Sequence, residues 1–313
     1  MSPKKYNNIE NYSDPGGSFL TPELTHQEMI DKLSSMSEWL ENIGVKFAHT
    51  RLPEYKKFLE KLPPPSSLNP IENDEHHKLL DRYIFAAREI GELFWIFDTF
   101  RKAHTLPPGA LPRLQAICRG QLFGKDDKDS RARDVQLELR IASHFLRCGY
   151  DIDLSQEADI YARSSTDRFF VECKRLSSPK KSAMRIKEAA KQLEKRTKKR
   201  FLQKDLGIAV FDVTRLAFPN LGMTWGITPE DCKFAIRSKL KEVLSQHDFT
   251  TPLIKNKNVI LIWVQVFVPT IAASTGQPAS RASSIFLPLA PKGGSRAEAF
   301  ERLKNVLEVG VRV

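Results

Sequence analysis

The sequence predicts an α/β fold in which helices flank a mixed β-sheet. Two observations support this class. In the first third of the chain, apolar residues recur at the spacing of one face of an α-helix. Beyond residue 130, helical segments alternate with short runs of β-branched and aromatic residues, in the order helix, β-meander, helix, strand. A chain of 313 residues can bury a large core and is long enough for two domains.

The first part of the chain is expected to be helical. Thr25 and Glu28 have the spacing of a capping box, in which each side chain bonds the other residue's backbone N–H, and Gly44 stops the helix that follows. Three prolines at 63–65 end a second helix, because proline has no backbone N–H to donate. The helices expected in this part lie near 25–44, 53–62 and 74–104.

The polar segment 124–133, GKDDKDSRAR, is the expected domain boundary. We expect a disordered tail at 1–20, an α-helical N-terminal domain at 21–125 and an α/β domain at 126–313. The helices expected in the α/β domain lie near 133–148 and 182–203, after Thr228, and near 296–308. The strands expected there lie near 150–154, 158–162, 168–174, 207–213, 259–268 and 284–289.

Composition and motifs argue against several classes of protein. The longest apolar run, VILIWVQVFV at 259–268, is about half a membrane span and is expected to be a buried strand, so no membrane association is predicted. Four widely spaced cysteines without a CxxC pair predict a reduced, cytoplasmic protein without structural zinc. The absence of P-loop, GxGxxG, HExxH and GxSxG motifs argues against an ATPase, a dinucleotide enzyme, a zincin and a serine hydrolase.

The net charge of +11 is concentrated in one segment. Residues 174–204 contain thirteen Lys and Arg and two Glu, a balance of 13 − 2 = +11, so the rest of the chain is close to neutral. A dense basic stripe on one helix favours a partner rich in phosphate, such as a nucleic acid. The alternative is a helix face that is simply solvated.

Three charged residues interrupt two of the expected strands, in the segment ADIYARSSTDRFFVECKRL at 158–176. Side chains alternate along a strand, so Glu172 and Lys174 share one face with Phe170. Asp159 lies thirteen residues before Glu172, the separation expected for neighbouring antiparallel strands joined by a turn. The two acids are therefore expected to converge at one end of the sheet.

A carboxylate on a helix is expected to join this cluster. Glu138 falls in the middle of the apolar face of the helix at 133–148, where an unpaired charge is costly, so it needs a cation, a metal or a hydrogen-bond donor. Two or three carboxylates beside one lysine suit Mg²⁺, which proteins hold with one or two carboxylates plus phosphate oxygens. Such a metal activates a bound water and polarises a phosphodiester, and the lysine stabilises negative charge.

Similar patterns elsewhere in the chain are expected to be structural. Glu54 and Lys56 flank Tyr55 in a helical stretch without a strand acid upstream, and PEDCK at 229–233 fits the start of a capped helix. Trp225 is expected in the core, with stacking on a nucleic-acid base as the alternative.

The order of elements and the residues Glu138, Ala158-Asp159 and Glu172-Cys173-Lys174 resemble the PD-(D/E)XK nuclease superfamily. That superfamily includes restriction endonucleases, Mrr-type enzymes, RecB-like exonucleases and archaeal Holliday-junction resolvases. The resemblance covers roughly residues 130–215, and this chain has Ala158 where the family signature has proline. It implies a restriction-endonuclease-like α-β-β-β-α-β core with a mixed central sheet.

The resemblance also implies a role for each of these residues. Asp159 and Glu172 would be metal ligands, with the backbone carbonyl of Cys173 as a further ligand. Lys174 would orient the attacking water or stabilise negative charge, and Glu138 would be a supporting metal ligand or acid. Mg²⁺ is the implied cofactor, and Mn²⁺ could substitute for it.

The basic helix adds further candidates. Several branches of the superfamily carry a glutamine on this helix near the active site, and Gln192 resembles that residue; a solvated surface glutamine is the alternative. Cations on and before the helix are expected to contact the nucleic-acid backbone without reading its sequence. They are Arg175, Lys180, Lys181, Arg185, Arg196 and Lys199.

These observations predict a Mg²⁺-dependent phosphodiesterase, most plausibly a DNA endonuclease of restriction, phage-defence or DNA-repair type. The family resemblance alone favours DNA over RNA. The alternative is a non-catalytic nucleic-acid-binding or assembly subunit that keeps a nuclease fold. The N-terminal helices are a candidate surface for a homodimer or for a partner protein.

Overall fold

The structure, a computed structural model, describes residues 24–63, 74–123, 130–198, 205–219, 224–274, 278–290 and 293–310. The predicted tail at 1–20 and the predicted phosphate contact Lys199 lie outside these residues. The described helices are α1 (His26–Asn42), α2 (Arg51–Lys61), α3 (Asp74–Lys102), α4 (Ala110–Ile117), α5 (Arg131–Arg147), α6 (Pro179–Lys198), α7 (Thr214–Ala217), α8 (Pro229–Gln246), α9 (Thr251–Ile254) and α10 (Ser295–Gly310). The described strands are β1 (Asp151–Asp153), β2 (Ile160–Arg163), β3 (Arg168–Arg175), β4 (Leu206–Asp212), β5 (Thr224–Gly226), β6 (Val259–Ala272) and β7 (Pro278–Pro288).

The strands form one mixed sheet in the order β1-β2-β3-β4-β6-β5, and β7 pairs with β6. The first three strands are an antiparallel meander, whereas β3, β4 and β6 run parallel to one another. Strand β5 is parallel to β6, and β7 is antiparallel to it. The mixed α/β class predicted from the sequence is therefore confirmed, and the elements from α5 to β4 occur in the expected order α-β-β-β-α-β.

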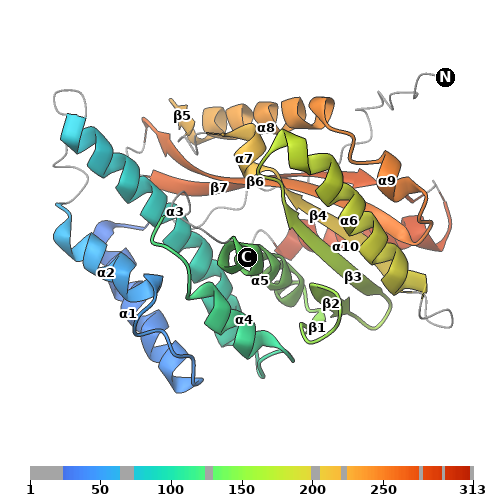
Figure 1. The fold of residues 1–313 in the computed structure, drawn as a ribbon, viewed down its shortest axis with the longest axis horizontal. Coiled ribbons are helices and arrows are strands. Elements are labelled where there is room, and N and C mark those ends of the chain that lie inside the picture. Colours follow the sequence, from blue (N-terminus) through green and yellow to red (C-terminus); the bar gives the residue numbers. More distant parts are fainter. Residues whose placement is uncertain are drawn as a thin grey trace.

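Helices cover both faces of the sheet (Figure 1). Helices α5 and α10 pack on one face, and α6 and α8 pack on the other. Helix α3 packs against α5 and against β6 and β7, and α1 and α2 lie beyond it (Figure 1). This arrangement leaves β3 between α5 on one side and α6 on the other.

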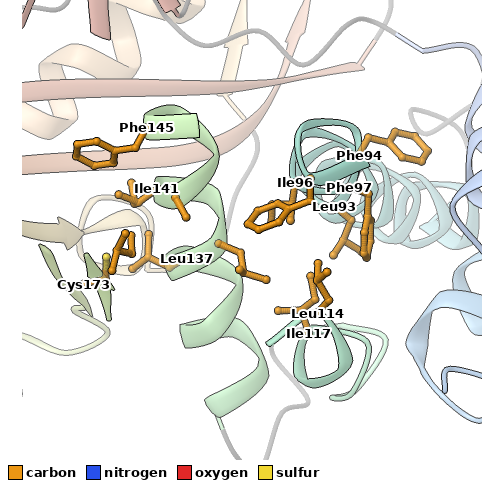
Figure 2. Close-up of a cluster of buried hydrophobic side chains, with 14 of the residues drawn as sticks. Leu93, Phe94, Ile96, Phe97, Leu114, Ile117, Leu137, Ile141, Phe145 and Cys173 are labelled. Atoms are coloured by element: carbon orange, nitrogen blue, oxygen red, sulfur yellow. The ribbon is translucent and has the colours of Figure 1, made fainter. Parts of the chain in front are cut away.

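The alternation predicted for β3 is confirmed. Phe169, Val171 and Cys173 belong to the buried cluster on the α5 side, whereas Phe170 belongs to the cluster on the α6 side. Figure 2 shows the first cluster, with apolar side chains of α3, α4 and α5 facing one another and Cys173 of β3 beside α5. Glu172, on the opposite side of the strand from Cys173, consequently faces α6.

The capping signals in the sequence also act as expected. The backbone N–H of Thr25 donates to Glu28 Oε2 at 2.7 Å, and the N–H of Glu28 donates to Thr25 Oγ1 at 3.3 Å. Thr228 and Asp231 make the same reciprocal pair at the start of α8, with Pro229 in the first turn. The acid–lysine pattern at 229–233 is thus part of a helix start, and Glu54 and Lys56 lie in α2, as predicted.

Several local expectations differ from the structure. Helices α4, α7 and α9 and strand β5 were not predicted. Each is eight residues long or shorter, and α4 contains Pro112, although its buried residues Ala110, Leu114 and Ile117 have helical spacing. Trp225 is 60% exposed, so its expected place in the core is wrong. The physical reason is its position in the three-residue strand β5, which pairs only with the end of β6 and ends the strand order.

The predicted division into two domains stays a prediction. One cluster of buried apolar residues contains side chains from α1 to α5, from β3 and β6, and from α10, so the N-terminal helices share a core with the sheet. Within the described ranges, every helix is too short or too polar to cross a lipid bilayer. None of the four cysteines forms a disulfide.

Candidate active site at the ends of strands β2 and β3

The pairing of β2 with β3 brings the two predicted metal ligands together. Ile160 lies opposite Val171 in the antiparallel register, so Asp159 and Glu172, each the next residue outward, lie opposite each other. Cross-strand neighbours in an antiparallel pair project from the same face of the sheet. The separation of thirteen residues in the sequence is therefore the result of a hairpin, as predicted.

Lys174 lies between these two carboxylates. Its Nζ atom is 3.5 Å from Glu172 Oε2 and 4.0 Å from Asp159 Oδ2. The side chain of Lys174 is 12% exposed and that of Asp159 is 20% exposed, so this cluster reaches the surface. The ammonium group is held on a strand in the middle of the sheet order, which fixes its position better than a loop would.

Glu172 is fully buried and contacts two cations. Its Oε2 atom faces Lys174, and its Oε1 atom forms an ion pair with Arg196 Nη1 of α6. Neither oxygen accepts a hydrogen bond from any residue that the structure describes. Each oxygen is thus neutralised by a cation, although within the described residues neither contact has the geometry of a hydrogen bond.

Asp159 is held by the backbone of β3. Its Oδ2 atom accepts a hydrogen bond of 2.8 Å from the N–H of Cys173. Within an extended strand, the N–H and C=O groups of one residue point to the same neighbouring strand, so the carbonyl of Cys173 is directed toward the side of Asp159. Burial and the Asp159 carboxylate raise the pKa of the Cys173 thiol well above its usual value.

Glu138 meets a cation that was not predicted. Its carboxylate forms an ion pair with Arg113 Nη1 of α4, and Arg113 Nη2 donates to the carbonyl of Leu154 at 3.1 Å. Burial lowers the pKa of Arg113, and the nearby Asp159 carboxylate opposes that shift. Glu138 and Arg113 therefore lie next to the Asp159 cluster, and the need of Glu138 for a partner is met by a guanidinium group.

Gly109 explains how α4 comes close enough to supply Arg113. It starts α4 with a backbone φ of 76°, in the left-handed region that favours glycine. A Cβ atom at this position would lie 2.6 Å from the backbone of Leu154 and Ser155. The close passage of the chain past the end of β1 therefore depends on glycine, and it brings the start of α4 to the edge of the site.

The cations predicted to bind nucleic acid divide into two groups. Lys180 and Lys181 are exposed at the start of α6, and Arg185 pairs on the surface with Glu188 at 3.1 Å. Arg196 instead turns inward to Glu172 and donates a hydrogen bond to the backbone carbonyl of Glu157. Its side chain is only 11% exposed, so it lies in the site rather than on the outer face of α6.

Gln192 lies one helical turn before Arg196. It is half-buried, and its Oε1 atom accepts no hydrogen bond from the described part of the chain. Helix α6 has an apolar stripe formed by Ile186, Ala189, Ala190 and Leu193, all four of which are buried. Arg196 is three residues after Leu193 and so continues this stripe, which is the sequence signal that indicates its inward direction.

Arg175 belongs to a second group of charges on the α5 side of β3. We call this group the buried arginine cluster. Its members are Arg51, Arg88, Arg133, Arg140, Arg175, Glu89, Glu92 and Asp212. Arg140 bridges Glu92 at 3.1 Å and Asp212 at 3.0 Å, and its guanidinium group lies over the ring of Phe267. The sequence did not predict this cluster, because its members come from elements far apart in the chain.

The electrostatics of the buried arginine cluster are strong. Burial by itself raises the pKa of Asp212, but Arg175, Arg140 and the hydrogen bonds of Thr214 outweigh it and hold the pKa at about 2. Burial and the neighbouring Arg51 lower the pKa of Arg133 to about 9. Arg175, whose side chain is 20% exposed, therefore contributes to a largely buried network that joins β3 to α3 through Glu92, at a distance of 3.8 Å.

The side chains at the ends of β2 and β3 suit a small, hard divalent cation. Asp159 and Glu172 supply carboxylate oxygens, and the two Glu172 oxygens accept no hydrogen bond from the described residues. No group of three or more His, Cys, Asp and Glu side chains within the described ranges is arranged to hold a metal ion. Two carboxylates are nevertheless the number that Mg²⁺ typically takes from a protein when phosphate and water complete its shell.

Comparisons with protein-family models, with curated proteins and with solved structures found no match to this chain.

Proposed function

We propose that this protein is a Mg²⁺-dependent nuclease that hydrolyses phosphodiester bonds, with DNA as the favoured substrate. One observation supports it above the others. Lys174 lies within 4.0 Å of carboxylates from two adjacent strands, one of which is fully buried and accepts no hydrogen bond from the described residues. Removing a charge from water costs free energy, and buried charges of this kind are common in catalytic sites.

Each residue has a defined task in this proposal. Asp159, fixed by the N–H of Cys173, and Glu172, fixed in the sheet, hold the metal, with the carbonyl of Cys173 directed to the same side. Bound Mg²⁺ supplies an activated water and neutralises charge on the scissile phosphate. Lys174 holds a donor and a positive charge beside the carboxylates, where it stabilises the charge that develops during hydrolysis.

The surrounding cations fit a substrate rich in phosphate. Lys180 and Lys181 are exposed on α6, which packs on the same face of the sheet from which Glu172 and Lys174 project. Such charges bind a phosphate backbone without reading its sequence. We place the protein in the cytoplasm and in restriction, phage defence or DNA repair, which the family resemblance suggests.

A second candidate function is a non-catalytic nucleic-acid-binding or assembly subunit. The observation that favours it is the pairing of each Glu172 oxygen with a side-chain cation, Lys174 on one side and Arg196 on the other. A carboxylate neutralised in this way does not require a metal. Titration with Mn²⁺ separates the candidates, because a nuclease site binds the ion and a purely structural ion-pair cluster does not.

The decisive experiment is a cleavage panel on the full chain. Linear, circular, single-stranded and branched DNA and an RNA are incubated with and without Mg²⁺, and the products are resolved on gels. We expect Mg²⁺-dependent cleavage of at least one DNA, and a loss of about 100- to 1000-fold in rate for Lys174→Ala. Lys46→Ala, at an exposed lysine after α1 and away from α6, is the control. A Lys174→Ala protein that cuts at the wild-type rate would disprove the assignment.

A further inference from the structure

The position of Arg196 supports an inference that rests on the proposed metal site and extends it. Arg196 lies in the last turn of α6, a helix whose other cations in that turn, Lys195 and Lys198, are exposed. Its guanidinium group instead enters the site with two contacts. Nη1 pairs with Glu172 Oε1, and Nη2 donates to the backbone carbonyl of Glu157.

Each carboxylate in the cluster around Glu172 is already neutralised by a side-chain cation. Asp159 and Glu172 contribute two negative charges, and Lys174 and Arg196 contribute two positive charges within ion-pair distance. Glu138 is likewise matched by Arg113. A divalent cation on Glu172 would therefore lie beside two like charges in a buried place, where repulsion is weakly screened. One of the two side-chain cations has to withdraw.

Arg196 is the cation that is free to withdraw. Lys174 is tied to both Asp159 and Glu172 and projects from a strand that is paired on both sides. Arg196 contacts only one of these carboxylates, and it lies in the last turn of a helix.

We propose that Arg196 substitutes for the divalent cation at Glu172 when no metal is present, and that metal binding exchanges its guanidinium group into solvent. The ion pair keeps Glu172 neutralised and the fold intact in the metal-free protein. The same pair competes with the metal, so it sets the metal concentration at which the site fills. Once displaced, Arg196 joins the exposed cations of the last turn of α6.

The test is Mn²⁺ binding to the full chain, measured by electron paramagnetic resonance, for wild type and Arg196→Met. Removal of the competing cation is expected to tighten Mn²⁺ binding by about 5- to 150-fold, the usual range for coupling between two bound groups. Lys195→Met is the matched control, since it removes the same charge from the same turn but contacts Glu157 at 3.9 Å and not Glu172. Its Mn²⁺ affinity is expected to stay within about twofold of wild type.

Thermal unfolding supplies a second readout and a check on folding. Without metal, Arg196→Met is expected to melt below wild type, and saturating Mn²⁺ is expected to raise its melting temperature more than it raises that of wild type. If Arg196→Met does not fold, Arg196→Gln, which keeps a polar group of similar length, takes its place in both measurements.

The outcomes separate this inference from the proposed function. If wild type and Arg196→Met bind Mn²⁺ with equal affinity, the exchange is disproved. If Glu172→Gln also loses Mn²⁺ binding, the proposed metal site is still supported. No Mn²⁺ binding in wild type or in Arg196→Met overturns both. If Lys195→Met binds Mn²⁺ more tightly than wild type by as much as Arg196→Met does, the effect comes from net charge alone. That result also disproves the exchange.

Discussion

Glu92 and Glu172 are both fully buried, and each contacts two cations, yet they lie in very different regions of the molecule. Glu92 belongs to the buried arginine cluster and accepts a hydrogen bond of 2.6 Å from Gln136. Its partner Arg140 is 1% exposed, whereas its second partner, Arg175, is 20% exposed. Glu172 accepts no hydrogen bond from the described residues, and its partners Lys174 and Arg196 reach the surface. The comparison suggests that Glu92 stabilises the fold, whereas Glu172 serves the proposed metal site.

The largest expected effect is a loss of stability when the charge of Glu92 is removed. Glu92→Gln removes the negative charge that pairs with Arg140, whose side chain is 1% exposed, and with Arg175, which is 20% exposed. We expect the free energy of unfolding in urea to fall by about 3–5 kcal/mol. Glu157→Gln, an exposed acid paired with Lys195, is the control and is expected to change it by less than about 1 kcal/mol. If Glu92→Gln is as stable as the control, the charge of Glu92 does not stabilise the fold through Arg140 and Arg175.

The next effect is a dependence of stability on pH that originates in the same cluster. The pKa of Asp212 is about 2 in the folded protein, below the value of about 3.9 in an unfolded chain. Its contribution is therefore fully present above pH of about 4 and is lost as the pH falls through about 2, an effect of about 2 kcal/mol. Unfolding free energies of wild type and Asp212→Asn should differ most near neutral pH and converge in acid. Glu41→Gln, which removes an exposed acid of α1, should show no such convergence.

Glu172→Gln is expected to cost much less than Glu92→Gln, although both side chains are fully buried. Lys174 keeps Asp159, Arg196 keeps the carbonyl of Glu157, and both cations can reach water. We expect a loss of about 1 kcal/mol in the free energy of unfolding without metal. Urea titrations in the presence of a chelator measure both variants side by side. If Glu172→Gln lowers the free energy of unfolding as much as Glu92→Gln does, the two buried glutamates stabilise the fold equally.

The smallest expected effect concerns the outer face of α6. Removing two exposed charges in the double variant Lys180→Gln and Lys181→Gln should weaken DNA binding similarly for all sequences. The slope of log affinity against log salt concentration should become shallower by about 0.9 for each phosphate that the variant no longer neutralises. Fluorescence anisotropy over a salt series measures it, with Lys46→Gln, an exposed lysine after α1, as control. An unchanged slope would exclude these lysines from the nucleic-acid interface.

The α/β class, most helix and strand positions and the meeting of Asp159 with Glu172 were predictable, because they depend on local periodicity and on one short hairpin. The partners of the acids were not. Arg113 reaches Glu138 from α4, a helix of only eight residues that was not predicted. Arg196 could have been found, since it continues the apolar stripe of α6. Trp225 was misplaced because hydrophobicity alone does not reveal a three-residue edge strand.

Glu92 and Arg113 both precede residue 126, whereas the carboxylates and the lysine of the candidate site all follow it. A fragment cut to 126–313 would retain Asp159, Glu172 and Lys174 but would strip Arg140 and Arg175 of an anion and Glu138 of its guanidinium partner. Attempts to isolate a minimal catalytic piece should therefore carry the leading helices along, because those helices supply counter-charges as well as any recognition surface.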